Sequence, residues 1–203
     1  HKYVDDIEAR EDGGTPAFLQ TIKTALCVQL KDKMGVQNIL DREHELHEII
    51  WNKFAELDNV HVLAANFSNR LGIYSFYIDN LHFNLAVQLL NDKYGIQVRG
   101  GCSCAGTYGH ILLNVEEEQS CAITTKINDG DLTLKPGWVR MSIHPTMTDK
   151  EMYYIMNAID FIAKNHDEMG KDYSYNKSSN EFIYKDNSFA LKNKERAESW
   201  FKL

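Results

Sequence analysis

The segment that constrains this chain most is residues 98–109, which read Val-Arg-Gly-Gly-Cys-Ser-Cys-Ala-Gly-Thr-Tyr-Gly. It combines four glycines, one arginine and two of the chain's four cysteines. Glycine allows positive φ angles and a close approach of the backbone to a ligand. The thiolate is the reactive form of cysteine, and a neighbouring cation or loop amides favour it. These residues therefore indicate a ligand-binding or reactive loop. An ordinary tight turn with two buried cysteines is the alternative.

Composition narrows the class of protein around this loop. A length of 203 residues corresponds to one domain, or one domain with a tail, and suffices for a hydrophobic core. The net charge of −7 argues against nucleic-acid and anionic-membrane partners. No apolar run approaches the ~18 residues that a membrane span needs. The charged N-terminus does not resemble a signal peptide, and four cysteines do not form a disulfide framework, so we expect a cytoplasmic protein.

Periodicity predicts alternating helices and strands. Thr15 and Pro16 have the residue types of an N-cap and a first helical position, and apolar residues follow at helical spacing until Gly35. The further expected helices are 38–57, 80–95, 113–128, 149–165 and, weakly, 188–202. The expected strands are 60–64, 71–78, 96–98 and 138–143, with a hairpin over 173–184.

The expected strand 138–143 holds Arg140 in a defined position. Val139, Met141 and Ile143 point to one side, and Trp138, Arg140 and Ser142 point to the other. A strand whose opposite face is buried holds such an arginine in position. A planar guanidinium binds a carboxylate with two parallel hydrogen bonds. A surface ion pair is the commoner alternative for an arginine.

Three motifs, in this order, resemble a known family. Segment 10–16, Arg-Glu-Asp-Gly-Gly-Thr-Pro, resembles the Gly-Thr-Pro segment that opens the C-terminal part of class V aminotransferases. The loop Arg-Gly-Gly-Cys-Ser-Cys-Ala-Gly-x-Tyr-Gly, starting at Arg99, resembles their active-site loop. Segment 137–143, Gly-Trp-Val-Arg-Met-Ser-Ile, resembles their strand with the substrate-carboxylate arginine. The group includes cysteine desulfurases and selenocysteine lyases. The resemblance spans roughly residues 1–165 and covers only the C-terminal half of such an enzyme.

The resemblance implies an α+β fold, with a small, mostly antiparallel sheet covered by helices, as in the C-terminal domain of fold-type I pyridoxal-phosphate transferases. It implies a lead-in from a missing large domain at 1–14, a small domain at 15–165 and an extension at 166–203. The chain starts with His rather than Met, so we expect a fragment that is inactive alone. The cofactor-binding lysine belongs to the missing half, because Lys2 lies too close to Thr15 to match it.

The resemblance also implies roles for particular residues. Arg140 binds the carboxylate of an amino-acid substrate, and Arg99 assists it. Cys104 is at the position of the nucleophile of one desulfurase branch. Gly14 and Thr15 lie at the phosphate of a pyridoxal cofactor held by the partner subunit, so the parent enzyme is expected to be a homodimer. No metal is implied.

Several alternatives stay open at this point. The loop lacks the histidine of that desulfurase branch, so an aminotransferase is as compatible with it as a desulfurase or a lyase. A non-catalytic dimerisation or regulatory module derived from the same fold is a second interpretation. A small metal or redox protein using Cys102, Cys104 and His110 is a third, although one Cys-x-Cys with one His is a poor zinc signature. His44 and His47 have helical metal-ligand spacing but no evident third ligand.

Overall fold

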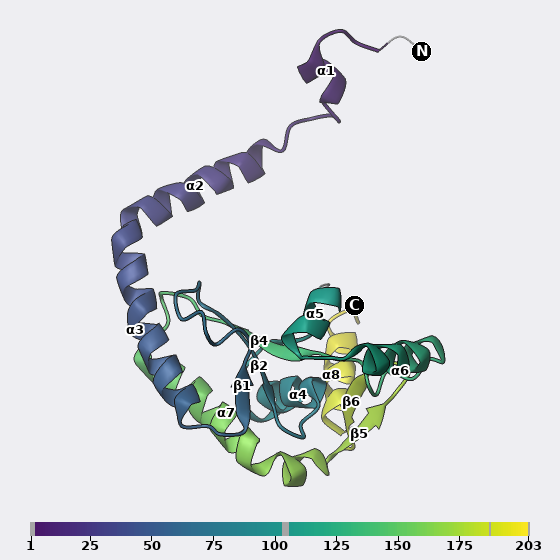
Figure 1. The fold of residues 1–203 in the computed structure, drawn as a ribbon. Helices are drawn as coiled ribbons and strands as arrows, with labels where there is room; N and C mark the ends of the chain where they lie inside the picture. The colour runs from purple at the N-terminus through teal and green to yellow at the C-terminus, as the bar shows by residue number, and fades with distance from the viewer. Residues whose placement is uncertain (1–2, 103–105, 187, 203) are drawn as a thin grey trace. The chain divides into compact units, whose positions relative to one another are not determined.

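The computed structural model describes residues 3–102, 106–186 and 188–202. In this part of the chain it is an α+β structure with eight helices and six strands (Figure 1). The helices are α1 Ile7–Glu11, α2 Phe18–Met34, α3 Val36–Ala55, α4 Phe83–Tyr94, α5 Gly106–Leu112, α6 Glu117–Asn128, α7 Asp149–Gly170 and α8 Ser188–Ser199. The strands are β1 Val60–Val62, β2 Ile73–Ile78, β3 Arg99–Gly101, β4 Trp138–Ser142, β5 Tyr173–Asn176 and β6 Glu181–Tyr184. None of the described helices is long and apolar enough to cross a membrane.

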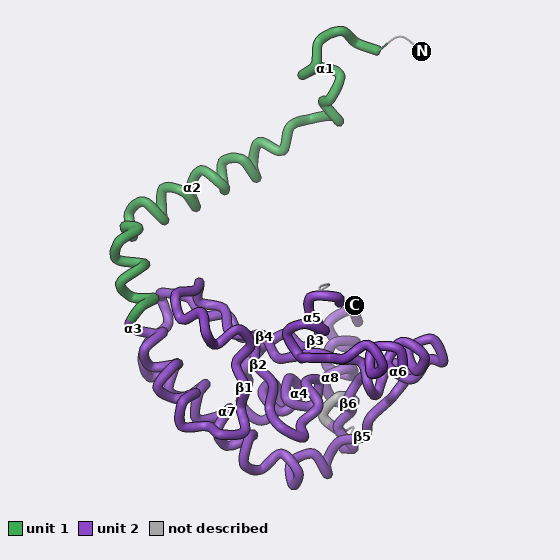
Figure 2. The backbone as a smooth tube through the Cα atoms, viewed as in Figure 1, with its two compact units in different colours: residues 1–44 green, residues 45–203 purple. Residues whose placement is uncertain are grey.

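The chain divides into two compact units, residues 1–44 and 45–203 (Figure 2). The division falls within α3, whose first residues belong to the first unit and whose remainder belongs to the second. The domain boundaries expected after residues 14 and 165 come from the family resemblance, whereas this division reflects contacts within the chain, so those boundaries stay predictions.

In the first unit, the expected helix start is wrong. α2 begins at Phe18, after Ala17, rather than at Thr15 and Pro16. The Phe18 N–H donates to the Pro16 carbonyl at 2.8 Å, a turn that delays the first helical residue. Gly35 ends the helix as predicted, with φ at 82° and its N–H donated to the Lys31 and Asp32 carbonyls.

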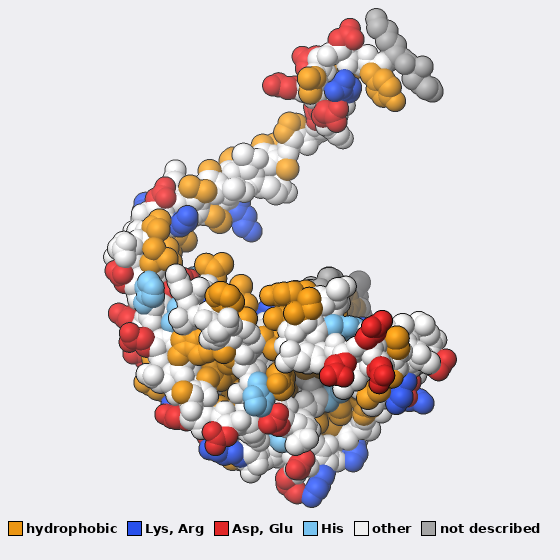
Figure 3. Space-filling view, in the orientation of Figure 1, with side chains coloured by type: hydrophobic (Ala, Val, Ile, Leu, Met, Phe, Trp, Pro, Cys, Tyr) orange, Lys and Arg blue, Asp and Glu red, His pale blue; other side chains and the backbone are white. Residues whose placement is uncertain are grey.

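The apolar stripe of α2 is not part of a core in this structure. Its residues Leu19, Ile22, Leu26 and Leu30 are 56–66% exposed, and no residue of α2 is buried. Apolar side chains therefore line the surface of this helix in the space-filling view (Figure 3). The polar lead-in before α2 also contains the short helix α1, which Asp6 caps through its carboxylate.

The second unit is built on a four-stranded sheet in the order β1-β2-β4-β3. All three pairings are antiparallel. The alternation along β2 and β4 separates two faces: Tyr74, Phe76, Ile78, Val139 and Met141 are buried in the core. Most of the rest of this core comes from the second part of α3, from α4 and from α7. The small antiparallel sheet expected from the sequence is thus confirmed.

Several boundaries in the second unit differ from those expected. The expected helix 113–128 begins only at Glu117, as α6, after Asn114 adopts a left-handed φ of 51°, and the preceding helix α5 was not predicted. α4 starts after His82 rather than Asn80, and the His82 imidazole accepts the Asn84 N–H as a cap. The strand expected at 96–98 pairs instead at Arg99–Gly101.

The segment after residue 165 begins with the end of α7 and continues as a hairpin and a helix. The hairpin of β5 and β6 was predicted and is confirmed, with Tyr173 opposite Tyr184. Thr148 and Glu151 form a capping box at the start of α7. The hairpin packs on α4: the Tyr173 hydroxyl donates to Asp92 at 3.0 Å, and Asn84 donates to the Asn180 carbonyl.

Candidate functional site

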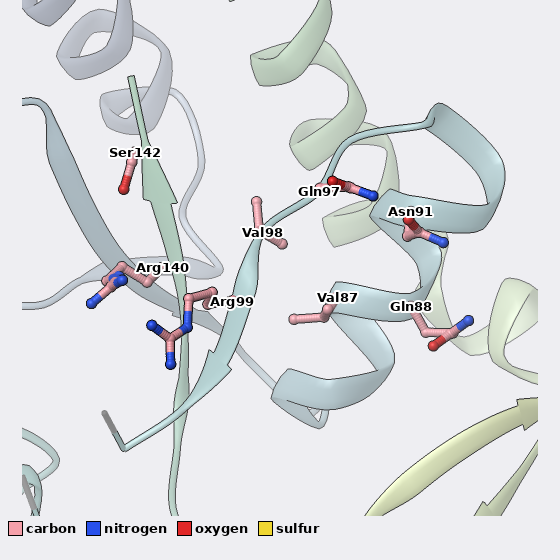
Figure 4. A pocket seen from close by; sticks show the side chains of 8 residues that line it. All are labelled: Val87, Gln88, Asn91, Gln97, Val98, Arg99, Arg140 and Ser142. Carbon is pink, nitrogen blue, oxygen red and sulfur yellow. The ribbon is translucent and has the colours of Figure 1, made fainter. Parts of the chain in front are cut away.

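Two arginines predicted from the sequence lie next to each other on the sheet. Arg99 of β3 is the direct antiparallel partner of Arg140 of β4, which in turn is opposite Ser75 of β2. Directly opposed residues share a face, and this face is the one opposite the core. Figure 4 shows both guanidinium side chains directed to the same side of the strands. The structure therefore brings together the two residues expected to bind a carboxylate.

The electrostatics of this pair favour an anion. Like charges directly opposite each other on a sheet destabilise it. Among the described residues neither arginine forms an ion pair, and the Nε–H of Arg140 is buried without a hydrogen-bond partner. A buried donor left unpaired costs about 1–3 kcal/mol. A carboxylate between the two guanidinium groups would reduce the repulsion between them and would also accept a hydrogen bond from the unpaired donor.

A cavity of about 470 Å³ adjoins the pair, within the size range of small-ligand sites. Its lining contains two cations and no acidic side chain, drawn from α4, from the segment leading into β3 and from β4. The lining residues are Val87, Gln88, Asn91, Gln97, Val98, Arg99, Arg140 and Ser142 (Figure 4).

The amide residues of this lining were not predicted from the sequence. Gln88 and Asn91 lie on α4, which was expected only as a helix, and Gln97 lies in the segment expected as a strand. The one feature of the sequence that could have identified the two helical amides is their spacing. Gln88 and Asn91 are three residues apart on the helix, so they share a face next to its buried stripe.

Three glycines of the loop motif are needed for different structural reasons. A Cβ at Gly100 would lie 2.9 Å from the Asn84 Oδ1 and 3.0 Å from the Val87 Cγ2, so only glycine lets β3 pack this closely on α4. Gly101 has a φ of 122°, a conformation that other residues rarely adopt. Gly109 of α5 is buried against the Trp138 ring. The loop is thus tied to the sheet at both ends.

Of the two loop cysteines, only Cys102 lies in the described part of the chain. It is a free, half-buried thiol directly after β3. Cys104, the predicted nucleophile, lies outside the described residues, so its role stays a prediction. Cys121, which was expected to be packed inside, is exposed on α6 instead, because its helix buries only Ile123.

Gly14 and Thr15 lie in the first unit, whereas Arg99 and Arg140 lie in the second. Gly14 has a φ of 138°, and its N–H donates to the Asp12 carboxylate at 3.0 Å. Thr15 is exposed, so its hydroxyl has the chemistry and the access to donate to a phosphate oxygen. Their contact with the phosphate of a pyridoxal cofactor stays a prediction.

The histidines in the described part of the chain do not form a metal centre. No cluster of three or more His, Cys, Asp or Glu side chains suited to a metal occurs in residues 3–102, 106–186 and 188–202. His47 is buried and hydrogen-bonded to the Tyr74 hydroxyl, whereas His44 is exposed. The His110 ring bonds to the Ser120 hydroxyl at 3.2 Å.

Comparison with known proteins decides the family. The model of the family described as aminotransferase class-V matches residues 1–155, more than half of the chain. This chain belongs to the class V aminotransferase family. The match includes the Gly-Thr-Pro segment, the glycine-rich loop and the strand β4 that carries Arg140. It ends within α7, before the β5–β6 hairpin.

Similar sequences and structures agree with this family. A cysteine desulfurase of Haloferax volcanii is 27% identical over 49% of this chain and 23% of its own length. A probable cysteine desulfurase of Halobacterium salinarum is 30% identical over 46% of this chain and 22% of its own length. The chain therefore spans only about a quarter of these relatives.

Solved structures show the same fold over part of their length. The apo structure of a cysteine desulfurase from Thermococcus onnurineus NA1 matches with a TM-score of 0.57 and 23% identity, over 81% of this chain and 36% of that one. The Escherichia coli cysteine desulfurase CsdA matches with a TM-score of 0.51 and 16% identity, over 75% of this chain and 32% of its own. At these identities the likeness concerns the fold alone.

Proposed function

We propose that this chain is the C-terminal small domain of a pyridoxal-phosphate enzyme that acts on an amino acid. The observation that carries the proposal is the opposed pair of Arg99 and Arg140, with the buried, unpartnered Nε–H of Arg140. An amino-acid substrate always presents a carboxylate, and two adjacent guanidinium groups suit it. Membership of the class V aminotransferase family supports the same conclusion.

In the proposed enzyme, residues of this chain bind the substrate carboxylate and contact the cofactor's phosphate. Arg140 binds and orients the substrate carboxylate, and Arg99 adds a second cation beside it. Bound pyridoxal phosphate supplies an electron sink for negative charge at the substrate's α-carbon. Thr15 donates to the phosphate of a cofactor held by the partner subunit of a homodimer. Gly14 has no side chain, so the backbone can approach that phosphate closely.

The reaction class depends on Cys104. In a desulfurase or selenocysteine lyase, its thiolate attacks the sulfur or selenium of the substrate. A new bond to the cysteine sulfur forms while the carbon–sulfur or carbon–selenium bond breaks, and the electron pair of the broken bond stays on the carbon skeleton. The similarity to cysteine desulfurases favours this reaction over transamination.

The test uses the whole enzyme that contains this chain. Arg140→Ala should lower kcat/KM for its amino-acid substrate about tenfold or more, since a charge-assisted contact contributes about 1.5–3 kcal/mol. Arg140→Lys should restore little, because a point charge does not replace the planar fork. Arg196→Ala, on the exposed α8, is the matched control. An unchanged kcat/KM in Arg140→Ala for every amino acid would refute the proposal.

A second candidate is a non-catalytic dimerisation or regulatory module, favoured by the apolar side chains that α2 leaves exposed. In a measurement on the chain itself the two candidates predict the same result, and they differ in whether the complete protein contains the cofactor-binding lysine. We expect that borohydride reduction in the presence of pyridoxal phosphate leaves no stoichiometric adduct at a single lysine. Such an adduct, together with turnover of an amino acid, would show that the chain is an enzyme by itself.

A further inference from the structure

The cavity beside the arginines lies between α4 on one side and β3, with the segment leading into it, on the other. This part of the cavity is called the groove. β3 is the last strand of the sheet and pairs only with β4 among the described residues, so its outer edge is open. On one side the groove is lined by Val87, Gln88 and Asn91 of α4, and on the other by Gln97, Val98 and Arg99 (Figure 4). An open strand edge beside a helix is a geometry that accepts an added peptide strand.

Asp92 fixes the orientation of the two amides of this groove. The Gln88 side-chain amide donates to both Asp92 carboxylate oxygens, at 3.0 and 2.9 Å, and Asn91 donates to the same carboxylate at 2.9 Å. A carboxylate only accepts hydrogen bonds, so both amides must turn their NH₂ groups toward it. Their carbonyl oxygens are thereby left to accept hydrogen bonds from other groups. A peptide backbone offers such donors at regular intervals.

The extension after residue 165 secures this arrangement. Tyr173 of β5 is only 5% exposed, and its hydroxyl donates to Asp92 at 3.0 Å. The same end of α4 is held to the hairpin by an ion pair between Lys93 and Asp172 and by the Lys93 ammonium 5.0 Å from the centre of the Tyr184 ring. The hairpin therefore determines how Gln88 and Asn91 present their oxygens.

We propose that this groove binds an extended peptide segment that adds as a strand to the open edge of β3. Val87 and Val98 contact its apolar side chains, and the Gln88 and Asn91 oxygens accept its donors. Arg99 is exposed at the edge strand, and the eight lining residues include two cations and no anion on a chain with net charge −7. The segment therefore carries a carboxylate, at its C-terminus or on a side chain, next to Arg99.

The experiment uses the full chain without cofactor, so it is independent of the proposed enzyme activity. Backbone amide resonances are followed by NMR while N-acetylated peptides of alternating Val and Thr are added. The peptides are about six residues long, which matches the extended segment 96–101. One ends in a free carboxylate and the other in an amide. Sodium acetate is titrated as a small carboxylate without a backbone.

We expect saturable shifts in residues 97–101 and along the groove side of α4. The free-acid peptide should bind about tenfold more tightly than the amidated one, the effect of one charge-assisted hydrogen bond. Arg99→Ala should remove that difference. Tyr173→Phe should weaken both peptides severalfold, because it frees Asp92 and lets the amides turn. Tyr184→Phe removes a hydroxyl from the same hairpin and should change neither affinity.

Three results would overturn the proposal. The first is the absence of groove shifts at millimolar peptide. The second is a set of shifts confined to other surfaces. The third is acetate that shifts the same resonances with the same affinity as the peptides, because the site would then bind only a small carboxylate. Equal losses in Tyr173→Phe and Tyr184→Phe would show that the hairpin acts through general stability, and would remove Tyr173 as a positioning residue.

Discussion

Single residues decide where the arginine pair sits. The alternation of β4 was readable from the sequence, because Val139 and Met141 are apolar and Arg140 is not, and the structure has this arrangement. The pairing of Arg140 with Arg99 was not readable, because register depends on contacts between segments far apart in the chain. The strand expected to end at Val98 in fact begins at Arg99, which places this arginine on the sheet rather than on the loop.

Gly137, next to β4, tests how tightly this region is packed. A Cβ at this position would lie 2.6–2.8 Å from three atoms of the buried Phe83 ring, and no φ strain is involved. Gly137→Ala should therefore lower the free energy of unfolding by about 1–3 kcal/mol, the usual cost of overpacking. Urea denaturation measures it. Gly13→Ala, where nothing lies within 4 Å, should change stability little, and equal effects of both substitutions would contradict the packing described.

At the scale of elements, the sequence predicted the presence of helices better than the residues at which they start and end. The expected ends of α2 at Gly35 and of the helix 80–95 at Gly95 were correct, because a C-terminal glycine acts on its own backbone. The His82 cap was missed, because histidine is not among the common N-cap residues. The start of α6 was expected four residues too early, at residue 113, because a single left-handed residue such as Asn114 gives no periodic signal.

The same His82 makes the attachment of the hairpin sensitive to pH. Its Nδ1 accepts the Asn84 N–H, and its Nε2 is buried without a hydrogen-bond partner in the described structure. The ring is stacked on Phe83 of α4 and faces Tyr175 and Phe182 of the hairpin. Burial lowers the pKa of His82, an effect that the Asn180 side chain partly opposes.

Because the folded-state pKa of His82 lies below about 6.5, the unfolded chain binds the proton more readily. The stability associated with neutral His82 is thus complete above about pH 6.5 and is lost as the pH falls toward the folded-state pKa. Urea midpoints measured between pH 7.5 and 5 should fall, and His82→Phe should reduce the fall. The outcome that contradicts this account is an identical pH dependence in both proteins.

At the scale of the whole molecule, the α+β class and the small, mostly antiparallel sheet were expected from the resemblance of three motifs to class V aminotransferases, and the structure has both. Periodicity by itself predicted only where helices and strands lie. The role of α2 was not predictable. Its apolar stripe resembles that of a core helix, yet none of its residues is buried. A periodic pattern shows that a helix has an apolar face, but it does not show what covers that face.

Hydrogen exchange measures this difference between the units directly. Amides of α2 should exchange far faster than those of α7, which buries seven residues, because a helix without buried contacts opens locally at low cost. Dilution of the sample should leave the α2 rates unchanged. Protection of α2 equal to that of α7 would mean that its apolar face is covered in solution.

The central claim is that the opposed arginines form a carboxylate site, and the Nε–H resonance of Arg140 reports on it most directly. The measurement follows this resonance by NMR in the full chain while L-alanine is added, with ethylamine as a control that has the amine without the carboxylate. The account predicts a saturable shift of the Arg140 Nε–H with L-alanine, little change with ethylamine and no saturation in Arg99→Ala. An Arg140 resonance that responds equally to both compounds, or to neither, would contradict it.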